Sequence, residues 1–472
     1  MTVFGSVLHG LEAFVLVYFA VLTLYYACAA FLGLGVIVAS SRELSPVALK
    51  DLVEHRYYKP VSVLVPAYNE EGVITQTVDS LLALRFPQYE VIVSVDGATD
   101  RTLARLIVAF GLRDSPEIYR RSVGTNKVRR VLRSPEHPEL TVLDKENGGR
   151  ADAVNAAVNL ARYPLVCVMD ADSLLNPEAL ARASRLFIED DAVVAVGGSL
   201  RPLNGAVVEH GAVVDAAAPS RWVERVQVLE YARSFFIARA AWSRLGSLMI
   251  ISGAFGVFRR EAVIEVGGWT PGLVADDMEM VLKLHRHFRD RALRYRIAFT
   301  PDPLCWTQVP RRVRDLQAQR SMWERGVLEV LWRYRRMLFN PRYGRIGLVG
   351  VPYLWLFEIG ATVVETTGYL LVVVSLAAGL LDVRFLLLFL VLAVLFGVLF
   401  SELGMTMQTL LLARHRRARD RLALFLAAFA EYLGIRQAVV LSRAVALFQV
   451  RSRRARYWRL ETTTSEARDG AR

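Results

Sequence analysis

Two hydrophobic blocks enclose a long region in which apolar and polar stretches alternate. Residues 13–41 carry no charged side chain, and about 20 apolar residues are enough for a helix to span a bilayer. The second block, 346–413, is interrupted by a short polar turn at 382–384 and otherwise carries three glutamates. We therefore predict an N-terminal transmembrane helix within residues 1–41 and a transmembrane helical hairpin at 346–413.

The region between the two blocks shows alternating strand and helix patterns. Short apolar runs rich in β-branched residues predict strands at 61–65, 91–95, 141–143, 165–169 and 193–196. Amphipathic stretches such as 72–84 and 102–110 separate the earlier runs. This alternation is typical of an α/β domain with a mostly parallel, doubly wound sheet and helices on both faces. We place that domain at 42–310, followed by interfacial helices at 311–345.

Basic residues next to the apolar segments indicate the orientation of the chain. The net charge is +12, with Arg42, Lys50 and Arg56 after the first apolar segment and five arginines within 414–421. Because basic flanks stay on the cytoplasmic side, we predict an outside N-terminus and a cytoplasmic α/β domain. The location expected is the plasma (inner) membrane, with several passes. A lipid bilayer is therefore the expected partner of these arginines, and we expect no nucleic-acid binding.

The last apolar stretch, 422–450, is less regular than the others. It contains Glu431, Arg436 and Arg443, with Gly434 in the middle. If it crossed the bilayer, the arginine-rich tail would end outside, against the charge rule. For residues 414–472 we therefore predict a basic loop, amphipathic or re-entrant helices at the cytoplasmic face, and a cytoplasmic tail.

Carboxylates follow several of the predicted strands. Asp96 comes directly after one strand, Asp170 and Asp172 follow another, and Asp276 and Asp277 stand together in a later loop. In open α/β sheets, ligands bind outside the carboxyl ends of the strands. Acidic residues that meet there can hold a divalent metal and, through it, a diphosphate. The pattern indicates an enzyme for an activated, phosphorylated donor beside a membrane.

Short motifs along the α/β region carry a resemblance to a known family. They are VSVLVPAYNE at 61–70, DGATD at 96–100, KENGGRAD at 145–152, DAD at 170–172, SGAF at 252–255, DD at 276–277 and QRSMW at 319–323. In this order they resemble the family 2 glycosyltransferases, especially membrane-embedded synthases of the hyaluronan, cellulose and poly-N-acetylglucosamine type. The resemblance implies a GT-A fold, a nucleotide-sugar donor that we expect to be UDP-linked, and Mg²⁺ or Mn²⁺ as cofactor.

The resemblance also implies roles for individual residues. Those implied to contact the nucleotide sugar are Ala67, Tyr68, Glu70, Asp96, Arg150 and Asp170. Asp172 is implied to hold the metal, together with Asp170, through the carboxylate oxygens that Mg²⁺ and Mn²⁺ prefer. Val95 stands where many members carry an aspartate that contacts the base. Two plainer interpretations stay open: the aspartates could cap a helix near residue 174, and Arg150 could be a solvated surface cation.

Asp277 is the expected general base. Transfer with inversion needs a carboxylate that takes the proton from the acceptor hydroxyl as this attacks the anomeric carbon. Asp276 and Asp277 stand where the family has a Glu-Asp pair. Either aspartate could also cap the helix expected at 278–287, and the two roles are compatible because a helix start fixes the direction of a carboxylate.

The motif at 319–323 departs from the family. Related synthases carry Gln-x-x-Arg-Trp, whereas Met322 stands here in place of the arginine. The resemblance implies acceptor binding by Gln319, Arg320 and Trp323, with the tryptophan under the acceptor sugar. The missing charge would come from Arg320 or Arg325. Trp323 could instead be an anchor at the bilayer surface.

Glu358 and Glu365 lie within the second hydrophobic block. They are seven residues apart and so share one helical face. Acidic residues are costly inside a bilayer and usually face protein or water. These two could line a path for a polar polymer or pair with Arg436 and Arg443, and the sequence favours neither.

These features predict an inverting, metal-dependent membrane glycosyltransferase that extends a β-linked polysaccharide. One alternative is the transfer of a single sugar to a lipid acceptor. A further alternative is an inactive, nucleotide-binding scaffold of a secretion complex, with an unknown secretion partner. The retained carboxylates favour an enzyme over the scaffold.

Overall fold

The computed structural model describes residues 3–43, 58–209, 211–412 and 418–449. These residues form two compact units. The sheet unit contains residues up to 216 after the first helix, together with 248–308. Of the described residues, the helical unit contains those up to 41, those at 217–247 and those from 309 to 449. Part of the predicted basic loop (413–417) and the predicted tail lie outside the described residues.

The segment 217–247 differs from the expectation of one continuous domain at 42–310. It groups with the helical unit. The reason is apolar packing: Val228 and Leu229 are buried in one cluster with Val398 and Leu424. The α/β domain is therefore interrupted by a helical insertion that the strand pattern did not reveal.

The sheet unit contains a ten-stranded sheet with the order β3-β4-β5-β2-β1-β6-β11-β8-β12-β7. Its strands are β1 (Val61–Ala67), β2 (Tyr89–Asp96), β3 (Arg113–Asp114), β4 (Val128–Arg133), β5 (Leu140–Lys145), β6 (Leu165–Val168), β7 (Ser173–Leu175), β8 (Val193–Pro202), β11 (Gly256–Arg259) and β12 (Arg296–Thr307). The central strands β5, β2, β1 and β6 are parallel, and so are β8 and β12. A separate hairpin joins β9 (Ala206–Glu209) to β10 (Ala212–Ala216).

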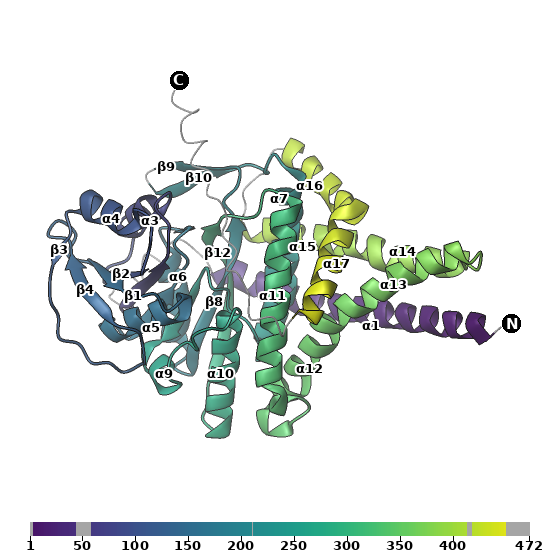
Figure 1. Ribbon diagram of the computed structural model, residues 1–472, viewed down its shortest axis with the longest axis horizontal. Coiled ribbons are helices and arrows are strands. Elements are labelled where there is room, and N and C mark those ends of the chain that lie inside the picture. The colour runs from purple at the N-terminus through teal and green to yellow at the C-terminus, as the bar shows by residue number, and fades with distance from the viewer. Residues whose placement is uncertain (1–2, 44–57, 210, 413–417, 450–472) are drawn as a thin grey trace. The chain divides into compact units, whose positions relative to one another are not determined.

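Helices cover both faces of this sheet, as the order of the strands requires. They are α3 (Ile74–Leu82), α4 (Thr102–Phe110), α5 (Arg150–Leu160), α6 (Ala179–Glu189), α9 (Arg260–Glu265) and α10 (Asp276–Asp290). The chain steps from β1 to β2 in one direction and from β5 to β6 in the opposite direction. Because such crossovers are right-handed, α3 and α5 lie on opposite faces (Figure 1). The predicted doubly wound, mostly parallel α/β fold is confirmed.

The core of the sheet unit explains why its strands read as continuous apolar runs. Strand β1 is buried along nearly its whole length, and helix α5 is buried from Ala151 to Leu160. Strands covered on both faces have no side open to water, so their sequences do not alternate. The polar residues of these elements are therefore concentrated at the strand ends.

The helical unit consists of long apolar helices and shorter amphipathic ones. Its main helices are α1 (Val3–Glu43), α7 (Trp222–Ala232), α8 (Ala240–Arg244), α11 (Val313–Arg333), α12 (Val351–Tyr353), α13 (Gly360–Ala377), α14 (Val383–Leu390), α15 (Phe396–Leu412), α16 (Ala418–Ala430) and α17 (Arg436–Phe448). Among the described residues, four segments are long and apolar enough to cross a membrane: Gly5–Ser40, Ile346–Ala377, Val383–Leu410 and Ala418–Phe448. The chain thus carries membrane-type helices at both ends, as its sequence predicts.

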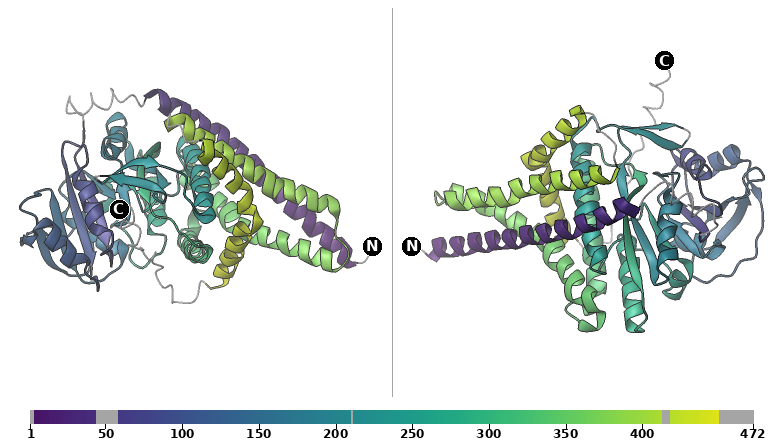
Figure 2. Two further views of the ribbon diagram at one scale, coloured as in Figure 1. Left: turned by 90° about the horizontal axis from the view of Figure 1, so that it is seen from above. Right: turned by 180° about the vertical axis from the view of Figure 1, so that it is seen from behind.

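Helix α1 lies alongside α13 and α14 (Figure 2). Val15 and Phe19 of α1 are buried against Leu371 and Phe389, and the rings of Phe19 and Phe389 meet edge to face with centroids 5.5 Å apart. The first apolar segment therefore packs on the hairpin that begins more than 300 residues later.

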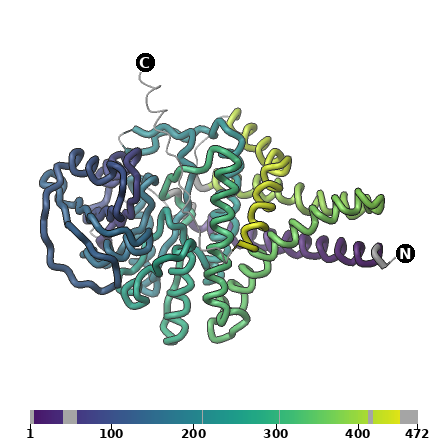
Figure 3. The backbone as a smooth tube through the Cα atoms, in the orientation of Figure 1, coloured from purple at the N-terminus to yellow at the C-terminus, as the bar shows by residue number. Residues whose placement is uncertain are grey.

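The fourth candidate span is bent. Leu433 and Gly434 leave the helical conformation, with a φ of 124° at the glycine, so α16 and α17 run in different directions (Figure 3). Each helix has 13 residues and is about 20 Å long. That is shorter than the hydrocarbon core of roughly 30 Å. The segment for which the sequence predicts short amphipathic helices thus consists of two short helices; their position relative to a bilayer stays a prediction.

Candidate functional site

The loops that follow β1 and β2 are fastened to each other at the carboxyl edge of the sheet. Asn69 donates through Nδ2 to the Thr99 hydroxyl at 2.9 Å and accepts the Thr99 backbone N–H at 2.7 Å. The backbone N–H of Glu70 donates to the Thr102 hydroxyl at 2.7 Å. These bonds fix the loop that carries Tyr68 and Glu70, two of the predicted nucleotide contacts, at the end of β1.

Asp96, at the end of β2, is held by donors of the protein itself. Its side chain accepts hydrogen bonds from the Lys145 ammonium and from the backbone N–H groups of Gly148 (3.0 Å) and Gly149 (2.7 Å). The residue is only 2% exposed. Its carboxylate therefore fixes the glycine-containing loop before α5, and its predicted contact with the base or ribose stays untested.

Lys145 lies among the candidate site residues, although the sequence motifs alone do not single it out. Its fully buried ammonium contacts Asp96 and also Asp152, the latter at 2.6 Å. The available signal was a lysine at the end of an apolar strand, where a buried cation needs anionic partners. The motif at 145–152 is thus held together by its own charges.

Arg150 joins three parts of the sheet unit. From the start of α5, its Nε donates to Asp170 at 3.0 Å, its Nη1 donates to both oxygens of Asp276 at 3.0 and 3.1 Å, and its Nη2 donates to the Gly253 carbonyl at 2.7 Å. Its side chain is 26% exposed. The interpretation of Arg150 as a solvated surface cation is therefore wrong.

Gly253 allows the close approach of Arg150 and also contacts Asp277. A Cβ atom at this position would lie 2.9 Å from Nη2 of Arg150, closer than real Cβ contacts. The Gly253 backbone N–H donates to Oδ2 of Asp277 at 3.1 Å. The peptide at Gly253 thus ties the arginine and the predicted base to the same short segment.

Asp277 lies in the first turn of α10, and its environment favours a carboxyl that can exchange a proton near neutral pH. Oδ1 accepts the backbone N–H of Met278 at 2.7 Å. Burial, followed by the charge of Asp276, raises the pKa of Asp277 to about 6, while Arg150 and the two backbone donors oppose the rise. A general base needs a pKa of this kind. The hydrogen bond at the helix start and the raised pKa are found on the same carboxyl, and its role as the base stays a prediction.

Asp170 and Asp172 occupy the loop after β6. Burial and then the neighbouring charge of Asp170 raise the pKa of Asp172 to about 7, although the Ser173 hydroxyl, 3.3 Å from its carboxylate, and Arg150 oppose the rise. A carboxyl whose ionisation is opposed by a second carboxylate two positions away suits a cation beside it. Their oxygens are the donor type that Mg²⁺ and Mn²⁺ prefer. The residues present therefore fit a divalent metal.

The predicted acceptor residues lie on α11 of the helical unit, a separate unit from the carboxylates. Arg320 donates through Nη1 to Gln319 at 2.8 Å and through Nη2 to Glu230 of α7 at 2.7 Å. Its guanidinium carbon is 4.1 Å from the centroid of the Trp323 ring, and Trp323 is 41% exposed. The charge of Arg320, expected to replace the arginine missing at Met322, is thus bound to neighbours on its own and an adjacent helix.

The glutamates of the second hydrophobic block pair with arginines of α17. Arg436 donates to both oxygens of Glu365 at 2.6 and 2.8 Å, and Arg443 donates to Glu358 at 3.0 Å. Of the two alternatives left open by the sequence, the structure contains the ion pairs. Buried charges in membrane-type helices are generally neutralised in this way.

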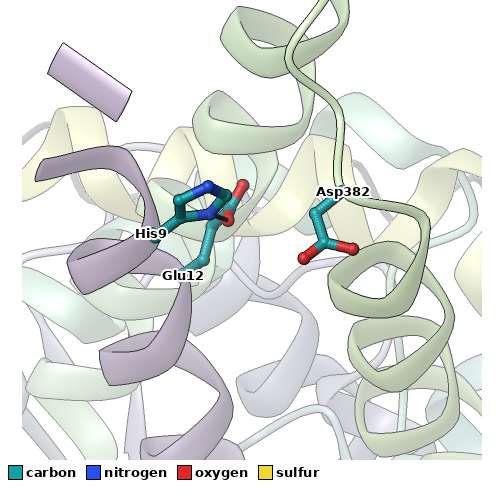
Figure 4. A group of neighbouring side chains, drawn as sticks. All are labelled: His9, Glu12 and Asp382. Carbon is teal, nitrogen blue, oxygen red and sulfur yellow. Dashed lines mark hydrogen bonds and ion pairs between the residues drawn. The ribbon is translucent and has the colours of Figure 1, made fainter. Parts of the chain in front are cut away.

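A second group of metal-ligating side chains, His9, Glu12 and Asp382, lies between α1 and the turn before α14 (Figure 4). Within the described residues it is the group that gathers three such side chains most closely. His9 pairs with Glu12 at 3.0 Å, and Asp382 accepts the Arg384 backbone N–H at the start of α14 at 2.7 Å. A hydrogen bond between His9 and Glu12 and a helix cap account for these residues, so we assign no metal to them.

The sheet unit defines the class of the protein, a GT-A glycosyltransferase fold with acidic loops at the carboxyl edge of its sheet. A mannosyltransferase from Pyrobaculum calidifontis, solved in complex with GDP-Man and Mn²⁺, shares this fold with a TM-score of 0.51 at 20% identity. That similarity covers 90% of this chain and 99% of that one. Residues 59–326, more than half of the chain, match the family described as glycosyltransferase like family 2. The chain belongs to this family.

Curated relatives share the same part of the chain. The poly-beta-1,6-N-acetyl-D-glucosamine synthase of Staphylococcus epidermidis is 27% identical over 281 residues, which are 59% of this chain and 57% of that protein. The synthase of the same name from Staphylococcus aureus strain MSSA476 is 28% identical over 274 residues, covering 58% and 56%. The chain thus matches little more than half the length of these relatives. Their similarity agrees with the predicted resemblance to membrane-bound polysaccharide synthases.

Proposed function

We propose that this protein is an inverting, metal-dependent membrane glycosyltransferase that extends a β-linked polysaccharide from a UDP-linked sugar. The observation that carries the proposal is the group of carboxylates around Arg150, in which Asp170 comes from the loop after β6 and Asp276 and Asp277 from the start of α10. Family membership and the curated relatives support a sugar transferase, and the names of those relatives make N-acetylglucosamine the first donor sugar to test.

Asp277 acts as the general base in this proposal. It takes the proton of the acceptor hydroxyl while the hydroxyl oxygen attacks the anomeric carbon from the side opposite the leaving group, so that the configuration inverts. Its bonds to Gly253 and Met278 keep one orientation of the carboxylate. A fixed base removes the orientational cost of the transfer step.

The donor is held at the ends of β1, β2 and β6. Tyr68 and Glu70 bind the nucleoside from their fastened loop, next to Ala67 at the end of β1. Asp96 contributes by shaping the loop that leads to Arg150. Asp170 and Asp172 would hold Mg²⁺ or Mn²⁺, which supplies positive charge against the diphosphate that leaves.

Purified protein in detergent, incubated with UDP-N-acetylglucosamine and a panel of other UDP-sugars, tests the proposal. We expect metal-dependent release of UDP with one donor, and a product long enough to be sized as a polymer. Asp277→Asn should abolish transfer because an amide accepts no proton. The matched control is Glu261→Gln, an exposed acidic residue in the first turn of α9, which should keep full activity.

The products separate this proposal from its rivals. A product with a single added sugar that extracts into organic solvent would show transfer to a lipid acceptor in place of polymer synthesis. UDP binding without release, with any donor, would favour the inactive scaffold. Full activity of Asp277→Asn would remove the assignment of the base.

A further inference from the structure

One side of α11 is bound to α17 by polar contacts at regular intervals. Gln317 donates through Nε2 to the Ala438 carbonyl at 2.9 Å, and the Ser321 hydroxyl donates to the Ser442 carbonyl at 3.1 Å. One turn further, Arg443 contacts Glu324 at 2.7 and 2.8 Å. Positions four and three residues apart lie on one helical face, so α17 holds α11 along a single side (Figure 1).

Two of the proposed acceptor residues, Gln319 and Trp323, lie on another side of the same helix. Gln319 and Trp323 follow Gln317 and Ser321 by two positions, and residues two apart on a helix do not share a face. The Trp323 side chain is exposed, although α17 covers another side of the same helix. The face that would receive a sugar and the face that is fastened are therefore distinct.

Glu324 is the most deeply buried of the fastening side chains. It is 2% exposed. Its Oε1 accepts a hydrogen bond from the Thr362 hydroxyl of α13 at 2.8 Å, and its Oε2 accepts one from Nε of Arg443. Arg443 also reaches Glu358. Two carboxylates, one arginine and one hydroxyl thus join α11 to α13 and α17 through a single buried network, which is more specific in geometry than apolar packing.

We propose that Arg443 and Glu324 are a positioning pair that sets where Gln319, Arg320 and Trp323 stand for the acceptor. The inference rests on the proposed function, because it concerns acceptor binding by that face. The pair lies on the side of α11 that faces α17 and takes no part in proton transfer. A shift of α11 by a fraction of a turn would move the Trp323 ring out of register with a sugar, and small misplacements of binding groups have large effects on rate.

The chain offers a matched control for this pair. Arg436 lies seven residues before Arg443 on the same helix and pairs with Glu365 of α13. Both arginines are partly buried partners of a glutamate in the helical unit. They differ in the helix that carries the glutamate: Glu324, the partner of Arg443, lies on α11, whereas Glu365, the partner of Arg436, lies on α13.

Transfer to β-1,6-linked N-acetylglucosamine oligomers, measured with UDP-N-acetylglucosamine while either substrate is varied, tests the inference. For Arg443→Gln and for Glu324→Gln we expect the acceptor KM to rise about tenfold or more, with the donor KM unchanged. Arg443→Lys, which keeps a cation beside Glu324 and Glu358, should recover most of the acceptor affinity that Arg443→Gln loses. Arg436→Gln should leave the acceptor KM close to that of the unaltered protein.

Each further outcome has a defined meaning. An unchanged acceptor KM in Arg443→Gln, or equal effects of Arg443→Gln and Arg436→Gln on both substrates, would overturn the positioning role and leave the proposed function intact. No transfer by the unaltered protein to any oligomer would overturn the proposed function, and the positioning role with it. Thermal unfolding in detergent identifies variants that fail to fold, and the conservative variant Arg443→Lys then decides.

Discussion

Nη1 of Arg150 binds both oxygens of Asp276, at 3.0 and 3.1 Å, from a helix that starts 126 residues earlier in the chain. The same guanidinium reaches Asp170 and the Gly253 carbonyl. One side chain therefore holds the loop after β6, the loop before β11 and the start of α10 in fixed relation.

Arg150→Lys should reduce transfer at least tenfold, because one ammonium cannot reproduce the planar fork that meets three partners at once. The measurement is the initial rate of UDP release at saturating donor. Arg162→Lys is the control: Arg162 pairs with Glu90 at 2.8 Å, at the start of β2. Equal rates for the two variants would contradict the bridging role of Arg150.

The pH dependence of transfer should follow Asp277. A base acts in its deprotonated form, so kcat/KM should rise by about tenfold per pH unit below the pKa of about 6 and level off above it. Arg150 opposes the raised pKa of Asp277, whereas the charge of Asp276 contributes to it. Arg150→Gln should therefore move the midpoint to higher pH, and Asp276→Asn should move it to lower pH.

A pH profile with no inflection near 6, in the absence of a change in the rate-limiting step, would contradict this assignment. Shifts of the same sign in the two variants would contradict the electrostatic explanation, since the two side chains carry opposite charges.

The main effect of Lys145→Met should be a loss of protein stability and not the loss of a contact with substrate. The substitution leaves the buried carboxylates of Asp96 and Asp152 without their cation. Removing one member of a buried ion pair costs about 3–5 kcal/mol. Thermal unfolding in detergent measures the loss of stability. Lys127→Met, at an exposed position in the loop before β4, serves as control. Similar unfolding temperatures for the two variants would contradict this prediction.

Removal of divalent cations should stop transfer. EDTA should abolish UDP release, and Mn²⁺ or Mg²⁺ should restore it, because both ions bind carboxylate oxygens. Asp172→Asn should weaken the binding of Mn²⁺, which electron paramagnetic resonance detects without turnover. Undiminished activity in EDTA would exclude the metal dependence proposed here.

Part of this architecture could be predicted from sequence because it depends on local patterns. The apolar runs at 61–65 and 91–95 correspond to β1 and β2, and the aspartates that follow the strands lie at the carboxyl edge of the sheet. The partners of these residues could not be predicted in the same way. Lys145 reaches back 49 residues to Asp96, and no periodicity encodes such a pair.

The helical unit shows the same limit. Hydropathy locates the apolar segments, but it contains no information on which arginine meets which glutamate. Arg320 could be proposed as a replacement for the charge missing at Met322 on sequence grounds, yet its place over the Trp323 ring depends on the side-chain geometry of α11 and on Glu230. The sequence of residues 217–247 likewise does not distinguish this segment from the α/β region. Its place in the helical unit depends on its apolar partners.

The bend at Gly434 has a consequence for counting passes through the bilayer. By length and composition, residues 418–448 qualify as a further crossing, and an additional crossing would put the two ends of the C-terminal region in different compartments. Two helices of about 20 Å each that change direction at the glycine do not form one straight span, and the sequence predicts that they stay at the cytoplasmic face. A reporter domain fused after the last residue should therefore share its compartment with one inserted in the loop between α15 and α16.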